Sequence, residues 1–298
     1  MQLAAVILVD GLVYASYLFM VGVGLSVIFG VQRVLNVTHG AFFAFGAYLA
    51  ATLIGIWYKA ELPQFGGFLM ILAAAVIVGV VLGTIIERGL LKFLYGKDEH
   101  IVVLATFAAF LVLEDVILIV WGHDPYYAYQ PMQLLGSTKI AGLAFDNYNL
   151  SMIALSGVVA TGLWYALRRT TWGKMLRAVI YDREISHAMG INVTAVFLGT
   201  FIIGSMLAAL GGAYLAPTIS VQPGIGVEVI VLAFAVVVIG GMGSIPGALI
   251  GAVVVGISRA AAVHLLPQVE LFVIYGIMAA VLIWRPEGLF APMKARLI

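Results

Sequence analysis

Long, uninterrupted apolar runs fill almost the whole sequence, and this feature constrains the fold more than any other. A membrane-spanning helix needs about 20 mostly apolar residues. Strands of a transmembrane barrel instead alternate apolar and polar residues, a pattern that these runs lack. In lipid, a helix satisfies every backbone polar group within its own segment. The sequence therefore predicts an all-α bundle of transmembrane helices in a single domain, 1–298, with apolar runs at 3–31, 40–58, 67–86, 101–121, 150–167, 193–216, 227–263 and 271–284.

The composition also indicates a lipid environment. The chain is 63% hydrophobic and only 10% charged, whereas soluble domains carry about 25% charged residues. A net charge of +1 gives no reason to expect nucleic-acid binding. There is no cysteine to form a disulfide or a thiolate ligand, and the five scattered histidines lack metal-ligand spacing. We therefore expect no metal, no cofactor and no catalytic residues.

The run at 227–263 is interrupted by glycine and proline. Gly costs about 1 kcal/mol and Pro about 3 kcal/mol inside a helix, and the run contains Gly-Gly-Met-Gly-Ser-Ile-Pro-Gly at 240–247. Ser244, shortly before the proline, is a favourable helix start. The sequence predicts two short spans that meet near Gly241 and Gly243. The break favours either close helix packing or a helix N-terminus at Ser244 that faces a transport path.

The distribution of basic residues predicts how the helices are oriented, because Lys and Arg concentrate in short cytoplasmic loops. If the long run crosses twice, there are nine crossings, the N-terminus lies outside and three basic groups share the cytoplasm. If it crosses once, there are eight crossings and the basic C-terminal tail lies outside, which is less favourable. The groups are Arg88, Lys92 and Lys97; Arg168, Arg169, Lys174, Arg177 and Arg183; and Arg285, Lys294 and Arg296.

A short polar segment at 33–40 separates the first two runs. Polar groups at a break inside a bundle are tolerated where they are buried in protein or face a water-filled path. We expect Asn36, Thr38 and His39 to lie near a solute path or its cytoplasmic gate. The alternative is a structural role in which Thr38 caps the second helix.

Acidic residues interrupt the fourth run at Glu114 and Asp115. Because adjacent helical side chains point about 100° apart, one of the pair can face a path while the other faces a neighbouring helix. We expect Glu114 at the path or gate. The alternative is a protonated pair that is hydrogen-bonded inside the bundle. Asp10, Glu228 and Arg259 are expected near span ends, where they cost little.

One five-residue sequence, Gly-Ala-Tyr-Leu-Ala, occurs at 46–50 and again at 212–216. Repeated halves are common in transporters. In a chain this rich in Gly, Ala and Leu, such a match also arises by chance. An internal repeat and a chance match both stay open.

Distinctive motifs are spread over the whole chain, at 24–30 (Gly-Leu-Ser-Val-Ile-Phe-Gly), 33–40, 46–48, 173–178, 182–184, 190–191, 240–248 and 285–290 (Arg-Pro-Glu-Gly-Leu-Phe). Together they resemble the permeases of branched-chain amino acid ABC transporters, in particular the smaller, H-type permease of the leucine, isoleucine and valine system. Asp10 stands where that family commonly has Asn, and Val37-Thr38 where Phe-Ala is common. The solute therefore stays open among branched-chain amino acids, other amino acids, urea, short amides and aromatic acids.

The resemblance implies a permease subunit of an ATP-driven importer in the bacterial inner membrane. It implies as partners a second permease subunit in a heterodimer, two cytoplasmic ATPase subunits and a periplasmic solute-binding protein. The chain has no Gly-x-x-x-x-Gly-Lys-Ser/Thr phosphate loop, so we do not expect it to hydrolyse ATP itself. The alternative is a self-sufficient secondary transporter with Glu114 and Asp115 as its proton relay.

The resemblance further implies that the cytoplasmic segment 173–190 contacts the ATPase. Glu184 and Gly190 have the six-residue spacing of the coupling motif of ABC permeases, with Ile185 and Ser186 in place of its alanines. Such a segment resembles a short helix along the membrane, with mixed charges that pair across the contact and a glycine that ends the helix. The residues expected to take part are Gly173, Arg177, Asp182, Arg183, Glu184 and Gly190.

Overall fold

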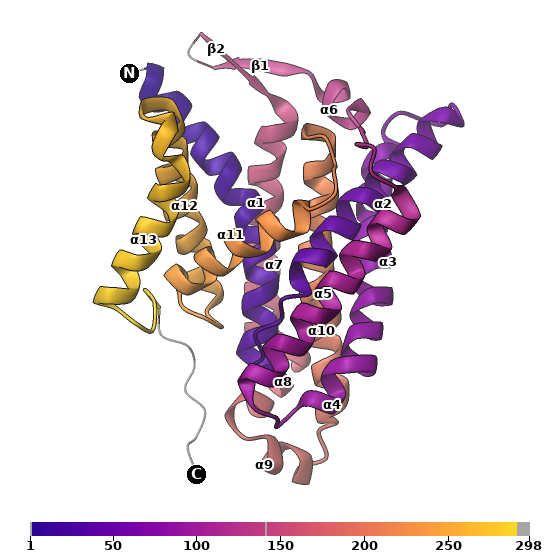
Figure 1. Ribbon diagram of the computed structural model, residues 1–298, viewed down its shortest axis with the longest axis vertical. Helices are drawn as coiled ribbons and strands as arrows, with labels where there is room; N and C mark the ends of the chain where they lie inside the picture. Colours follow the sequence, from indigo (N-terminus) through magenta and orange to yellow (C-terminus); the bar gives the residue numbers. More distant parts are fainter. Residues whose placement is uncertain (1, 141, 291–298) are drawn as a thin grey trace.

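The computed structural model describes residues 2–140 and 142–290, most of which are helical. The helices run between an end that carries a short β-hairpin and an end that carries α8 and α9 (Figure 1), which we name the hairpin end and the basic end. The elements are α1 (Gln2–Gln32), α2 (His39–Lys59), α3 (Gly66–Ile86), the π-helix η1 (Glu87–Leu91), α4 (Lys92–Leu94), α5 (Glu99–Trp121), α6 (Gln130–Leu135), β1 (Ser137–Ile140), β2 (Leu143–Asp146), α7 (Asn147–Arg169), α8 (Thr171–Tyr181), α9 (Arg183–Ala188), α10 (Val193–Leu215), η2 (Ala216–Thr218), α11 (Ile225–Gly240), α12 (Ile245–Leu265), η3 (Pro267–Val269) and α13 (Glu270–Trp284).

Apolar helices account for all the predicted spans in the described part of the chain. Seven of them are long and apolar enough to cross a membrane, and α11 and the apolar part of α13 are shorter. The predicted all-α polytopic bundle is therefore confirmed. The run at 227–263 divides as expected, because α11 ends at Gly240 and α12 begins at Ile245. Ser244 caps α12, since its Oγ accepts a hydrogen bond of 3.1 Å from the Gly247 N–H.

A β-hairpin that the sequence did not predict covers the hairpin end. Its two strands are antiparallel, with Ser137 opposite Asp146. Each strand has only four residues, which is too few for an alternating pattern to stand out beside the apolar runs.

The central helix of the bundle is α1, which contacts α7, α10, α11 and α12. All of its residues from Ala15 to Ile28 are buried. Glycine allows its close approach to α12, because a Cβ on Gly11 would lie 2.8 Å from the Cα of Ile257. Such small-residue contacts let helices in a membrane gain dispersion energy where the hydrophobic effect is weak.

The two Gly-Ala-Tyr-Leu-Ala sequences lie at a contact between α2 and α10. A Cβ on Gly46 would overlap the carbonyl oxygen of Ala209, and one on Gly212 would overlap the carbonyl oxygen of Phe43. Phe43 and Ala209 each stand three residues before the first glycine of the repeated sequence, so the two contacts are equivalent. The repetition is thus reflected in a symmetric helix contact.

The two basic groups that the structure describes in full lie at one end of the bundle, as nine crossings require. Figure 1 shows α4, α8 and α9 there. The segment after α13 packs against the end of α11, where the Leu289 N–H donates to the Ile239 carbonyl at 2.9 Å. Lys294 and Arg296 lie outside the described residues.

Candidate functional site

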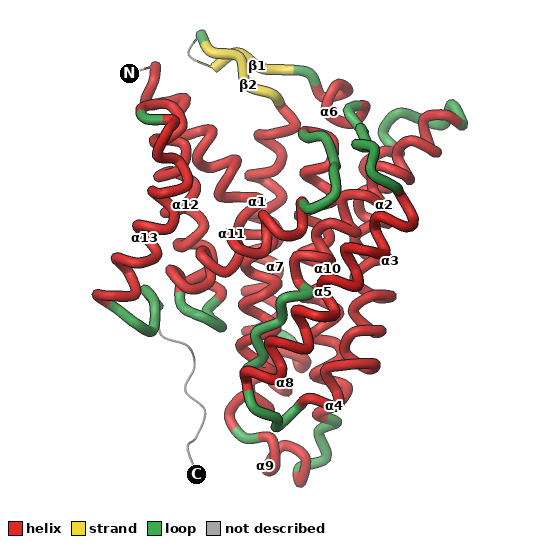
Figure 2. The backbone as a smooth tube through the Cα atoms, viewed as in Figure 1, coloured by secondary structure: helices red, strands yellow, loops and turns green. Residues whose placement is uncertain are grey.

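Non-helical segments enter the bundle from opposite ends. After α1 the chain turns at Arg33, which has a φ of +55°, and continues unwound to the start of α2 at His39. After α10 and η2, the segment 219–224 leads from the hairpin end to the start of α11 at Ile225. Figure 2 shows both as green loops among the red helices. Non-helical backbone at membrane depth is stable only where protein or water satisfies it.

The first unwound segment is held by a hydroxyl and a carboxamide. Thr106 of α5 accepts a hydrogen bond from the Val37 N–H at 3.3 Å and lies 3.4 Å from the Leu35 carbonyl oxygen, to which it donates. The Asn36 carboxamide oxygen accepts from both the N–H and the hydroxyl of Thr38. Thr38 makes no side-chain hydrogen bond to the start of α2. Thr38 occupies the N-cap position, but the alternative that its side chain caps this helix is wrong, because its hydroxyl is committed to Asn36.

His39 begins α2 and is fully buried. Its Nε2 lies 2.9 Å from the Val21 carbonyl oxygen, and because a carbonyl only accepts, Nε2 carries the proton. Nδ1 has no hydrogen-bond partner among the described residues. The ring lies against Gly24, where a Cβ would stand 3.0 Å from its Cε1. The imidazole therefore offers one free acceptor to the interior of the bundle.

The starts of α2 and α11 meet at Gly40, Gly226 and Glu114, which we name the mid-bundle junction. A Cβ on Gly40 would lie 2.5 Å from the Gly226 carbonyl oxygen, and a Cβ on Gly226 would overlap the Glu114 carboxylate. The Glu114 carboxylate of α5 therefore lies against the first turn of α11. Asp115 is exposed on α5, so the two carboxylates do not share one site.

Five of the eight buried side-chain polar atoms that lack a hydrogen-bond partner in the described chain come from the elements around this junction. Buried polar groups in proteins are nearly always hydrogen-bonded. Unpaired atoms of both donor and acceptor type suit this region to receive a polar occupant. The atoms are Ser26 Oγ, Asn36 Nδ2, His39 Nδ1, Tyr48 Oη and Glu114 Oε1.

The glycine break between α11 and α12 lies at the basic end, away from the mid-bundle junction. A Cβ on Gly243 would stand 3.0 Å from the Cα of Gly30, near the end of α1. Gly241 has a φ of +105° and lies against the Phe290 backbone. These contacts pack the glycine break closely against α1 and against the segment after α13. A path or gate role for Gly241, Gly243 and Ser244 stays a prediction.

The expected coupling segment forms two short helices, α8 and α9. Asp182 caps α9, since its Oδ1 accepts from the Ile185 N–H at 2.9 Å. Gly190 ends the helix with a φ of +83°, which favours glycine. Gly173 allows the tight turn after α7, and the Arg177 Nε donates to its carbonyl at 3.3 Å. Gly173 and Arg177 thus shape the segment itself.

The segment 181–189 carries exposed apolar side chains beside a carboxylate. Tyr181, Ile185 and Met189 follow one another at four-residue spacing and are 57%, 53% and 77% exposed. Glu184 is also exposed. Tyr181 ends α8, Ile185 lies in α9 and Met189 follows α9. We name these three exposed side chains the apolar stripe, and Glu184 stands next to Ile185 in sequence.

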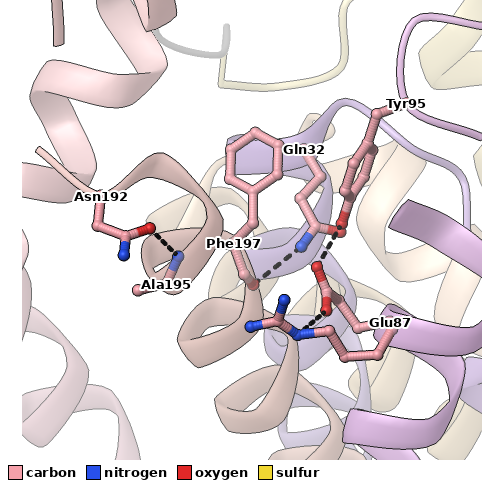
Figure 3. A network of polar contacts seen from close by, with 7 residues as sticks. Gln32, Glu87, Tyr95, Asn192, Ala195 and Phe197 are labelled. Carbon is pink, nitrogen blue, oxygen red and sulfur yellow. Dashed lines mark hydrogen bonds and ion pairs between the residues drawn. The ribbon is translucent and has the colours of Figure 1, made fainter. Parts of the chain in front are cut away.

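Arg183 joins the coupling segment to the end of α1. Its Nη2 donates to the carbonyls of Val31 and Gln32, at 3.4 and 3.2 Å. Its guanidinium lies 4.8 Å from the ring centre of Phe197, and burial lowers its pKa from the usual value. The Gln32 Nε2 in turn donates to the Phe197 carbonyl at 3.0 Å (Figure 3). The start of α9 is therefore fixed to the point where α1 unwinds towards His39.

The same network reaches the end of α3. The Tyr95 ring packs on Phe197, with 5.0 Å between ring centres, and its hydroxyl donates to Glu87 Oε1 at 3.3 Å (Figure 3). Burial raises the pKa of the Tyr95 hydroxyl above its usual value, so it stays a donor. Arg88 lies 3.4 Å from the other carboxylate oxygen of the fully buried Glu87. In the sequence, Glu87 next to Arg88 looks like an ordinary charge in a loop. The sequence therefore did not indicate that Glu87 is buried.

Comparisons with known proteins bear on the family of this chain. The family model described as the permease component of the branched-chain amino acid transport system matches residues 7–282. The permease protein BraD of a high-affinity branched-chain amino acid transport system, from Pseudomonas aeruginosa, is 27% identical over 95% of this chain and 94% of its own length. LivH from Escherichia coli K12, a permease protein of the same kind of system, is 25% identical, with 94% and 93% covered.

A similarity to sugar permeases extends over less of the chain. The ribose import permease protein RbsC of Haemophilus influenzae is 24% identical over 74% of this chain and 67% of its own length. The family model, by contrast, covers nearly all the membrane helices described above. This chain therefore belongs to the family of permease components of branched-chain amino acid transport systems.

Proposed function

We propose that this chain forms one half of the path of an ATP-driven importer for branched-chain amino acids or related small polar solutes. As a permease subunit of an ABC importer, it is a multi-pass inner-membrane protein that works with ATPase and solute-binding partners. The observation that carries the proposal is the mid-bundle junction, where two helix starts meet beside unpaired buried polar atoms. The positive-inside rule assigns the basic end to the cytoplasm.

A second permease completes the path and forms a heterodimer with this chain. Asp115 supports this pairing, because it is exposed within the apolar helix α5. A carboxylate facing lipid at such depth is costly. Contact with a second permease, or with a water-filled path between the two, removes that cost.

The helices α8 and α9 dock on an ATPase subunit in the cytoplasm. The apolar stripe of Tyr181, Ile185 and Met189 supplies buried area, and Glu184 next to Ile185 supplies charge complementarity. Displacement of α9 on ATPase closure is passed through Arg183 to the end of α1. From there it reaches the unwound segment that leads to His39, which acts with Asn36, Thr38 and Glu114 as path or gate.

The proposal is tested by copurification and by transport in proteoliposomes that contain the complete complex and its solute-binding protein. The unaltered chain should bring ATPase subunits with it and support leucine uptake. Glu184→Lys should reduce ATPase recovery or uptake per complex by at least tenfold, because it reverses a charge at the contact. Glu61→Lys, the same change at an exposed site on the hairpin end, is the matched control and should leave both unchanged.

Normal transport by Glu184→Lys, with no cross-link from α9 to an ATPase, contradicts the docking role. Failure of the unaltered chain to copurify with any ATPase contradicts the importer itself.

A further inference from the structure

A large cavity opens at the hairpin end, on the side of α11 that is lined by α1, α7, α12 and α13. Its volume is about 940 Å³, within the range of small-molecule sites. Its wall includes Thr218 and Ile219, in the stretch that leads down to α11. Its deep end reaches Tyr17 on the central helix and Glu228 in the first turn of α11. Because α11 starts at the mid-bundle junction, the cavity extends from the hairpin end to the level of that junction.

Arg259 of α12 is held in place on one wall of this cavity. It forms an ion pair with Glu270 at the start of α13. Its guanidinium also stacks over Tyr14 of α1, 3.9 Å from the ring centre. The side chain keeps 31% of its surface exposed, and a guanidinium has five N–H donors. Arg259 is thus fixed by two neighbours and retains donors for an anionic group in the cavity.

Glu228 supplies the opposite charge. It is exposed to the cavity and forms no ion pair among the described residues. Glu228 and Arg259 line the same cavity as Tyr14 and Tyr17. Glu228 lies in the first turn of α11, near the end of its helix as expected, but this end lies inside the bundle (Figure 1). A carboxylate in the first turn of a helix is stabilised there by the helix dipole.

The remaining charges of the cavity are engaged or lie at its mouth. Asp10 is paired with His264 at 2.8 Å, and Asp146 stands at the end of β2. Between these charges the wall is apolar, with Val13, Leu150, Ile219 and Val231 among its residues. The cavity therefore combines the Arg259 guanidinium, the Glu228 carboxylate and an aliphatic surface.

We infer that this cavity is a station for a zwitterionic amino acid with an aliphatic side chain. Arg259 receives the solute carboxylate, Glu228 receives the ammonium group, and the apolar wall receives the side chain. This inference rests on the proposed function and names a binding site for its solute. A solute that lacks the ammonium group leaves Glu228 unpaired, and a solute that lacks the carboxylate leaves the spare Arg259 donors unused, so each binds more weakly than the zwitterion. The station thus selects the zwitterion over the corresponding amine or acid.

The test compares complete complexes that contain the unaltered permease, its Glu228→Gln variant or its Arg259→Lys variant. Uptake of radiolabelled leucine is measured in proteoliposomes at saturating solute-binding protein. Leucine binding is measured on vanadate-trapped complex without the solute-binding protein, in competition with leucinol, which lacks the carboxylate, and 4-methylpentanoate, which lacks the ammonium group. Glu61→Gln, an exposed carboxylate outside the cavity, is the matched control.

Both cavity variants should lose about tenfold or more in uptake and in leucine binding, while Glu61→Gln changes neither. Glu228→Gln should also bind 4-methylpentanoate no more weakly than leucine, because the ammonium partner is gone. Glu228 forms no ion pair, so its variant should assemble normally even where Arg259→Lys disturbs the contact between α12 and α13.

Unchanged uptake and binding in assembled Glu228→Gln complex overturns the station while leaving the proposed function intact. Absence of leucine uptake by the unaltered complex overturns the proposed solute instead.

Discussion

His39 has one ring nitrogen committed to the Val21 carbonyl and one without a partner among the described residues. Asn36 is divided in the same way, since its oxygen holds Thr38 and its amide nitrogen is unpaired. A structural role needs the committed atoms, whereas a transport role needs the free ones. Asn and His each carry both a donor and an acceptor, which suits them to a passing zwitterion.

Substitution of these two residues separates the roles. His39→Ala and Asn36→Ala each remove one or two hydrogen bonds, worth about 1 kcal/mol apiece in stability, so assembled complex should still be recovered. Uptake per assembled complex should fall at least tenfold, with nucleotide binding by the ATPases unchanged. The control is Thr161→Ala, whose hydroxyl bonds only to its own helix. Rates equal to those of the unaltered complex in both variants would leave a purely structural role.

At the scale of helices, glycines set the distances on which the site depends. The contact of α2 with α10 positions His39 at the start of α2, and the approach of Gly40 to Gly226 positions α11 against it. Interiors are packed closely enough that one added methyl group forces a backbone shift where there is no room. Glycines of the same helix are therefore unequal in importance.

A pair of alanine substitutions on α2 tests this inequality. At Gly46 a Cβ overlaps the Ala209 backbone, whereas at Gly55 nothing lies within 4 Å. Gly46→Ala should destabilise the chain by about 1–3 kcal/mol through overpacking. Gly55→Ala should be neutral or stabilising by up to about 1 kcal/mol, because alanine favours helix. Thermal denaturation of the purified complex, followed by size-exclusion chromatography, measures both. Equal melting temperatures would show that the contact of α2 with α10 yields to the extra methyl group.

At the scale of the whole molecule, local sequence predicted the spans but not the depth at which they begin. The apolar runs and the glycine break at Gly241 have local causes, and the structure follows both. The segment before His39 resembles an ordinary polar turn, but Thr106, about 70 residues away in sequence, hydrogen-bonds it inside the bundle. The segment 219–224 is likewise held by distant Tyr126, whose backbone pairs with Val221. Such contacts between remote segments leave no periodicity for a single sequence to reveal.

The orientation of the whole molecule is tested in this cysteine-free chain by adding one cysteine at a time. Basic residues gather at the end that carries α8 and α9, and the positive-inside rule assigns that end to the cytoplasm. A cysteine appended after Ile298 should therefore resist an impermeant maleimide in intact cells and react after permeabilisation. Thr138→Cys, at an exposed position of β1 on the hairpin end, should react in intact cells. The unaltered chain provides the background, since it has no thiol. With eight crossings the appended cysteine would be labelled from outside. With the whole bundle inverted, the appended cysteine would be labelled from outside and Thr138→Cys would be protected. Labelling of Thr138→Cys alone is the result that nine passes with an external N-terminus require.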